Sequence, residues 1–322
     1  MHENRKSPEH AGRARMGLIQ FREQTMDIEC LRTIVARHAA SANALVALGL
    51  AMDARVRGTT LDGDAARRTE AVLGELGVSG IVASANAVEL APVLASIRVD
   101  LLSGGKLLSE RSASAQALEA SLRQAFGDVS AGFPALFKRL IAPQLADLPE
   151  RLDAPGAAFL DIGVGVGALS VSMLRQWPGL RAVGVDPLPE AIAQAQSNVR
   201  AAGLEHRIEL RTGLGQDITD KDAFDLVFVP SAFIPEPHVR AIVQRSQTAL
   251  RPGGWLLLAM VNPEPDTLGD ALTRFRTTVW GGTVFEKGAA QALAEQCGYT
   301  DSRLLPGPTG APVAFVAGRK PG

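Results

Sequence analysis

A glycine-rich turn between two apolar segments constrains the fold of this chain more than any other feature. Residues 159–167 read Phe-Leu-Asp-Ile-Gly-Val-Gly-Val-Gly. A second acid, Asp186, closes the apolar segment 182–185, twenty-five residues after Asp161. An apolar strand that runs into a glycine turn and a helix, with an acid ending the next strand, is typical of an α/β sheet. Such a sheet binds an adenosine-bearing ligand at its carboxyl edge.

The hydrophobic periodicity changes near residue 150. Before it, apolar residues recur at helical spacing and no hairpin pattern is visible. After it, short apolar strands alternate with helices, which predicts a parallel sheet with helices on both faces. The last two strands are joined by the turn-rich segment 306–310 and should pair antiparallel. The predicted strands are residues 157–162, 181–186, 207–211, 224–229, 255–261, 302–305 and 312–317.

These patterns predict an α/β fold with a Rossmann-like, mostly parallel, seven-stranded sheet that ends in an antiparallel strand pair. An all-α N-terminal domain precedes this sheet. We expect a flexible tail over residues 1–25, a helical lid or dimerisation domain over 26–150, and a ligand-binding domain over 151–322.

Composition excludes several classes of function. The chain has 322 residues with 33 basic and 34 acidic side chains. It therefore lacks the surplus of basic residues that would indicate a nucleic-acid partner. Cys30 and Cys297 are too few for a disulfide framework or zinc site, and the five histidines lack ligand spacing, so we expect no metal. No uninterrupted apolar run approaches the roughly 18 residues of a membrane span. Residues 1–15 lack a signal peptide, which favours a cytoplasmic protein without membrane contact.

Two ligands compete for the glycine turn. Gly163, Gly165 and Ala168 fit the dinucleotide fingerprint, and Asp186 follows Gly165 by 21 residues. Asp161 opposes this reading, because its carboxylate would face the pyrophosphate and repel it by several kcal/mol. A ligand with a positive amino-acid end, such as S-adenosylmethionine, would be attracted instead. The antiparallel strand pair points the same way, and a nicotinamide-dependent oxidoreductase is kept as a remote alternative.

In combination, these motifs resemble the class I S-adenosylmethionine-dependent methyltransferases over residues 150–322. The resemblance implies that Asp161 orients the ligand's ammonium group and that Asp186 accepts hydrogen bonds from both ribose hydroxyls. Leu214 would cover the adenine, where many relatives carry an acid, so Gln216 or Asp217 could supply the polar contact. The resulting cofactor-binding residues are Asp161, Gly163, Gly165, Gly167, Asp186, Leu214, Gln216 and Asp217.

The helical N-terminal domain gives the chain the layout of the small-molecule O-methyltransferases. Members of that family carry a catalytic histidine shortly after the fourth strand, but here the place falls near Ala232 or Phe233. The candidate catalytic residues are therefore Glu236, His238 and Ser231. Glu236 equally suits the positive end of the helix that follows it.

The acceptor pocket is expected between three walls. They are residues 230–238, residues 262–285, and the helical domain through Phe133 and Phe137. Trp280 lies in the second wall but suits the core better. Aromatic and apolar walls with few charges fit a small, partly apolar acceptor.

These inferences predict a methyltransferase of secondary metabolism that uses S-adenosylmethionine on a small molecule. An alternative on the same fold consumes this cofactor without methylation, as a cyclase does. The helical domain would also provide the surface of a homodimer.

Overall fold

The computed structural model describes residues 28–110, 119–262, 267–305 and 313–322. The chain divides into two compact units, residues 1–43 and 44–322. The division falls inside helix α1 (Ile28–Arg57), whose first half is the described part of the first unit. The predicted tail over residues 1–25 lies outside the described residues, and the predicted domain boundary near residue 150 stays a prediction.

The N-terminal part of the second unit is helical, as expected. Its core gathers Met52 of α1 with Leu73, Val82 and Leu94 from the next three helices. The last of these three helices is capped at its N-terminus by Asn86. Oδ1 of Asn86 accepts hydrogen bonds from the backbone N–H groups of Val88 and Glu89. The helices are α2 (Gly63–Glu75), α3 (Ser79–Ser84), α4 (Ala87–Glu110) and α5 (Ala120–Ser130).

Helix α1 is the one described helix that is long and apolar enough to span a membrane, judged by length and composition alone. Charged residues interrupt its apolar run in the sequence, whereas its average hydropathy stays high. A signal sequence or the core helix of a soluble protein meets the same criteria.

A broken helical segment leads into the sheet. It consists of α6 (Phe133–Leu136), a π-helical turn η2 (Phe137–Ile141), a 3-10 turn η3 (Ala142–Gln144) and α7 (Leu148–Asp153). Phe137 is fully buried, and the Phe133 ring packs on the rings of Phe137, Phe228 and Phe315. The expectation that Phe137 lines the acceptor pocket is therefore wrong, because its ring belongs to the core on one face of the sheet. Phe133 is partly buried and packs against the same core, and its place in the pocket stays a prediction.

The sheet has seven strands in the order β3-β2-β1-β4-β5-β7-β6. All neighbours pair in parallel except β7, which is antiparallel to both β5 and β6. The predicted mostly parallel sheet with a terminal antiparallel pair is confirmed; the segment between β6 and β7 lies outside the described residues. The strands are β1 (Ala158–Ile162), β2 (Arg181–Asp186), β3 (Ile208–Thr212), β4 (Phe224–Pro230), β5 (Leu250–Val261), β6 (Thr300–Leu305) and β7 (Val313–Arg319).

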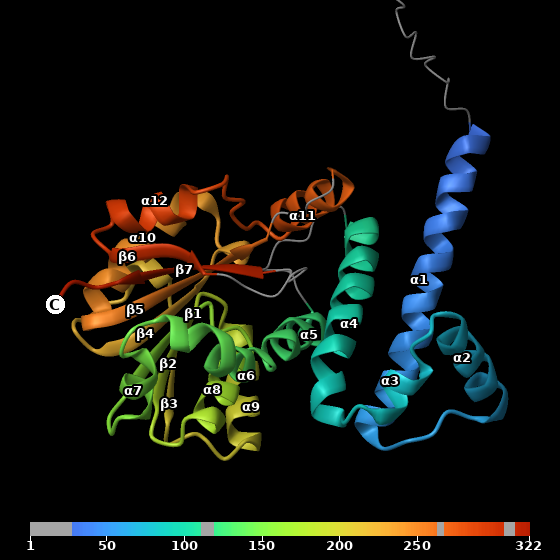
Figure 1. Cartoon of the computed structure of the whole chain (residues 1–322), viewed down its shortest axis with the longest axis horizontal. Coiled ribbons are helices and arrows are strands. Elements are labelled where there is room, and N and C mark those ends of the chain that lie inside the picture. Colours follow the sequence, from blue (N-terminus) through green and yellow to red (C-terminus); the bar gives the residue numbers. More distant parts are fainter. Residues whose placement is uncertain (1–27, 111–118, 263–266, 306–312) are drawn as a thin grey trace, which may run out of the picture. The chain divides into compact units, whose positions relative to one another are not determined.

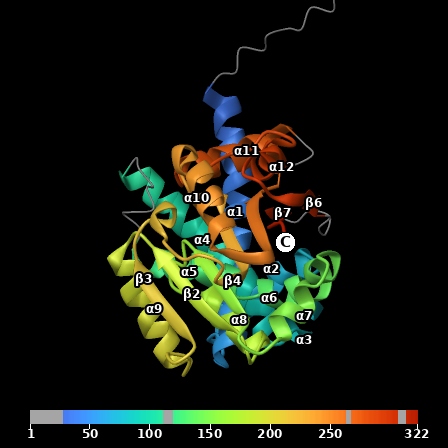
Figure 2. The same cartoon turned by 90° about the vertical axis from the view of Figure 1, so that its left-hand side faces the viewer.

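Helices cover both faces of the sheet (Figures 1 and 2). Alternating strand residues enter opposite cores, as Leu226 and Val227 of β4 show. One face carries α8 (Ala168–Gln176) and α9 (Pro189–Ala201), and the other carries α10 (Glu236–Ala249) and α12 (Ala289–Gln296). Helix α11 (Thr267–Val279) follows β5.

The strand order reverses direction between β1 and β4. From β1 the chain continues to β2 and β3 on one side, whereas β4 pairs with the other side of β1. Parallel sheets of this type bind ligands at the carboxyl edge of such a reversal. The glycine turn after β1 lies at this edge.

Candidate active site

The glycine turn is held against the end of β2. The backbone N–H groups of Gly163 and Val164 both donate to the carbonyl oxygen of Val185, at 2.7 and 3.1 Å. Gly165 has a φ of +54°, which glycine adopts most easily. A Cβ added there would meet only the carbonyl oxygen of Gly163, at 3.9 Å, so this side of the turn is open to a ligand.

Asp161 is buried at the end of β1, with 2% of its surface exposed. Ser170, in the first turn of α8, donates a hydrogen bond from its Oγ to Oδ2 of Asp161 at 2.6 Å. Burial raises the pKa of the Asp161 carboxyl to about 7; the Ser170 hydrogen bond opposes this rise and the charge of Asp186 adds to it. A cation placed beside Asp161 would therefore stabilise its ionised form.

Asp186 links β2 to the glycine turn. Its Oδ2 accepts a hydrogen bond from the N–H of Gly165, and its Oδ1 accepts one from the N–H of Leu188, both at 2.9 Å. Burial raises the pKa of Asp186 above its usual value; the two backbone N–H groups and the charge of Arg123 oppose the rise. A carboxylate can accept about four hydrogen bonds, so Asp186 keeps capacity for two ligand hydroxyls.

Helix α5 lies against the glycine turn, which the sequence did not predict. A Cβ on Gly127 would fall 2.2 Å from Cγ2 of Val166, so the two segments meet too closely for any side chain. Asn198 of α9 donates to the carbonyl oxygen of Val166 at 2.9 Å and to Oε1 of Gln124 at 3.0 Å. In the sequence, only Gly127, a glycine after an amphipathic helical run, could have indicated this close contact.

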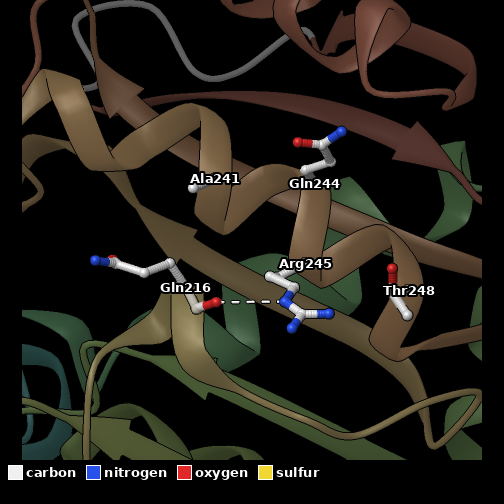
Figure 3. A pocket seen from close by; sticks show the side chains of 5 residues that line it. All are labelled: Gln216, Ala241, Gln244, Arg245 and Thr248. Atoms are coloured by element: carbon white, nitrogen blue, oxygen red, sulfur yellow. Dashed lines mark hydrogen bonds between the residues drawn. The ribbon is translucent and has the colours of Figure 1, made fainter.

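The residues predicted to border the adenine follow β3. Leu214 is 44% exposed and precedes the 3-10 turn η4 (Gly215–Asp217). The Gln216 amide lies 3.2 Å from Nδ1 of His238, and its backbone carbonyl accepts a hydrogen bond from Nε of Arg245 (Figure 3). Asp217 is exposed. The shallow hollow in Figure 3 follows α10 and is lined by Gln216, Ala241, Gln244, Arg245 and Thr248.

The three predicted catalytic residues lie in different surroundings. Ser231 is fully buried, and its Oγ donates to the carbonyl oxygen of Ala259 in β5 at 2.8 Å. Glu236 is exposed in the first turn of α10. His238 is exposed and is paired with Gln216. Their catalytic roles stay predictions.

No cluster of three or more His, Cys, Asp or Glu residues suited to a metal occurs among the described residues.

Three aromatic rings meet where α5, α11 and the turn after β4 come together. Phe233 and Trp280 stack with centroids 5.6 Å apart and planes inclined by 15°. Phe126 meets both rings edge-on, at 5.3 and 4.9 Å. We call these three residues the aromatic trio. Phe126 was not recognised in the sequence, because only the fold brings α5 to this place.

Comparison with known proteins agrees with this geometry. Residues 159–254 match a family model described as "Methyltransferase domain". A release factor glutamine methyltransferase of Geobacter sulfurreducens is 31% identical over 138 residues, covering 35% of this chain and 48% of the relative. A ubiquinone biosynthesis O-methyltransferase of Xanthomonas axonopodis pv. citri is 32% identical over 117 residues, covering 36% and 47%. The chain thus spans about half the length of the curated relatives that it matches.

Solved structures share the fold over more of the chain. The S-adenosylmethionine-dependent methyltransferase SibL is 17% identical, with coverage of 92% of this chain and 100% of that one and a TM-score of 0.57. The mitomycin 7-O-methyltransferase MmcR is 20% identical, with coverage of 92% and 99% and a TM-score of 0.55. PigF, solved with SAH, is 20% identical, with coverage of 91% and 99% and a TM-score of 0.57.

The fold and the glycine turn together define the class of protein. The chain carries a methyltransferase domain over residues 159–254, and it shares the class I methyltransferase fold with the solved structures that it resembles. The family match favours S-adenosylmethionine over a dinucleotide as the ligand of the glycine turn.

Proposed function

We propose that this protein transfers a methyl group from S-adenosylmethionine to a small, partly apolar molecule. The observation that carries this proposal is the pair of buried acids beside the open glycine turn. Asp161 offers a carboxylate to an ammonium group, and Asp186 offers two free acceptor positions to a ribose. The Asp161 carboxylate does not suit a pyrophosphate, whose negative charge it would repel.

The residues around the turn fit this cofactor. Gly165 leaves space on the open side of the turn, whereas Gly167 is already packed, because a Cβ there would lie 3.3 Å from Cβ of Ala195. When bound, S-adenosylmethionine supplies a methyl group on a sulfonium sulfur, and this sulfur is already a good leaving group. The protein therefore has to bind, align and keep water away from the acceptor.

The aromatic trio is the proposed wall for the acceptor. The backbone segments that carry Phe233 and Trp280 lie close together, because a Cβ on Gly282 would lie only 1.8 Å from the carbonyl oxygen of Ala232. The N–H of Thr283 also donates to the carbonyl oxygen of Ser231 at 2.9 Å. Phe233 keeps 39% of its surface exposed, which leaves an apolar face for a substrate.

The test uses S-adenosylmethionine with an isotopically labelled methyl group and a panel of small phenols, amines and hydroxyquinones. Labelled product together with S-adenosylhomocysteine supports the proposal. Formation of 5′-methylthioadenosine instead would show the alternative, a cyclase-type reaction without methylation. Glu236→Gln and His238→Ala, tested on the active acceptor, would show whether either residue acts as the base.

We also propose that the helical part forms a homodimer. Val46, Leu50 and Leu101 line a groove between α1 and α4 and are 37 to 46% exposed. A second copy of the chain would cover this apolar surface. Light scattering of the wild type and of Leu50→Glu tests this, since a monomeric wild type would contradict it. We further propose that the methyltransferase is cytoplasmic, acts in secondary metabolism and has no nucleic-acid partner. The net charge of −1 supports the absence of a nucleic-acid partner.

A further inference from the structure

A chain of side-chain amides connects helix α5 to the glycine turn. Oε1 of Gln124 accepts two hydrogen bonds, from Nδ2 of Asn198 and from Nε2 of Gln194, each at 3.0 Å. Nδ2 of Asn198 also donates to the carbonyl oxygen of Val166, at 2.9 Å. Gln194 donates further to the carbonyl oxygen of Ala120, at 3.0 Å. The amides are oriented so that each donor meets an acceptor, and turning the Gln124 amide would place donors against donors.

The carbonyl oxygen at the end of this chain belongs to the turn that receives the cofactor. Val166 stands between Gly165 and Gly167, both of which have positive φ angles, so its neighbours impose little rigidity on it. Val166 is 2% exposed and lies directly under Gly127 of α5. The position of the turn therefore depends on α5 through packing and through the Asn198 amide.

Helix α5 also reaches the ribose end of the site. Burial raises the pKa of Asp186, and the charge of Arg123 opposes this rise; Oδ2 of Asp186 accepts a hydrogen bond from the N–H of Gly165. Nε of Arg123 donates to Oε1 of Gln194 at 3.3 Å, which ties this guanidinium to the same amide chain. One helix thus acts on both the turn and its acid.

We propose that Gln124 and Asn198 are positioning residues for the cofactor. Together with Gly127 they hold the glycine turn in its binding form, so that docking of α5 and binding of the cofactor are coupled. This inference rests on the proposed function, because it takes the glycine turn as the site of S-adenosylmethionine. The coupling makes the helical part, through α5, a contributor to cofactor affinity.

The test compares Asn198→Ala and Gln124→Ala with the wild type, using S-adenosylhomocysteine as the probe. Asn198→Ala removes the hydrogen bond to the carbonyl oxygen of Val166, and Gln124→Ala removes the acceptor that orients the Asn198 amide. We expect the affinity in calorimetry to fall about fivefold for each variant. Hydrogen exchange of residues 163–167 should rise in the unliganded variants. The matched control is Gln291→Ala, which removes a comparable amide hydrogen bond to Glu295 on α12, away from the site, and should bind normally.

Two further variants separate positioning from loss of folding. In the wild type, the Gln124 amide accepts from Gln194 and Asn198 and donates to Oδ1 of Asp128. Gln124→Glu combined with Asp128→Asn keeps both accepted hydrogen bonds and reverses the direction of the third. The affinity of this double variant should therefore be close to that of the wild type and above that of Gln124→Ala. Gly127→Ala removes no hydrogen bond but pushes α5 from the turn and should weaken binding. If the wild type binds no S-adenosylhomocysteine, the proposed function fails. If the wild type binds and Asn198→Ala, Gln124→Ala and Gly127→Ala bind equally well, only the coupling is refuted.

Discussion

The affinity for the cofactor should depend on pH through Asp161. In the unliganded protein the pKa of Asp161 is raised to about 7, so near pH 6 most molecules carry a proton there. A ligand ammonium group favours the carboxylate, so binding must displace this proton at low pH and not at high pH. With a pKa of about 7, affinity at pH 6 should be about tenfold weaker than its limit at high pH, or about 1.4 kcal/mol.

Calorimetry with S-adenosylhomocysteine between pH 5.5 and 7.5, in buffers of different ionisation enthalpy, measures both the affinity and the protons released. The comparison ligand is 5′-methylthioadenosine, which lacks the ammonium group and should show only the smaller slope that the raised pKa of Asp186 produces. Asp161→Asn should weaken binding of S-adenosylhomocysteine and make the two slopes equal. A wild-type affinity that is constant over this range would refute the assignment of Asp161 to the ammonium group.

Three other predictions follow from the same contacts. Asp186→Ala should weaken S-adenosylhomocysteine binding by about 1.5–3 kcal/mol in calorimetry, because charge-assisted hydrogen bonds to the ribose are lost; unchanged affinity in a folded variant would contradict the ribose assignment. Gly165→Val should abolish binding by filling the open side of the turn, whereas Gly156→Val, with a similar positive φ and no neighbour within 4 Å, should bind normally. Asp225→Ala should lower the free energy of unfolding in urea by about 2 kcal/mol, since it removes the buried partner of Arg251. That value lies below the usual cost of a broken buried pair because Arg251 can still reach water, and a change under about 0.5 kcal/mol would contradict this role.

The parts of the fold that could be predicted are those with local signals. The segment from β1 to β2 alternates apolar runs with glycine turns, and the predicted bounds of both strands agree with the observed ones to within one residue. Strand β5 was predicted to begin at Trp255 but begins at Leu250. Residues 252–254 read Pro-Gly-Gly, which is typical of a turn. In the structure they belong to β5, whose pairing with β4 is irregular, because the register shifts between Phe224 and Leu226. An irregular pair depends on the partner strand and leaves no local pattern.

The site was predictable only as far as the cofactor. The positions of Asp161 and Asp186 could be predicted from the sequence, because each lies at the end of a strand and the two strands end at the same edge of the sheet. Whether Phe137 lies in a core or a pocket depends on distant partners such as Trp177, which aromatic character alone does not reveal. Likewise, the hydroxyl of Ser231 is engaged by Ala259, a carbonyl 28 residues away. Contacts of this range arise from the fold and cannot be read from short motifs.

The most direct test of the central claim is equilibrium binding of S-adenosylhomocysteine and NADH to the same wild-type preparation, measured by calorimetry. We predict saturable binding of S-adenosylhomocysteine at one site per chain, abolished by Gly165→Val, and no binding of NADH. Absence of S-adenosylhomocysteine binding, or binding that Gly165→Val leaves unchanged, would contradict the placement of the methyl donor on the glycine turn.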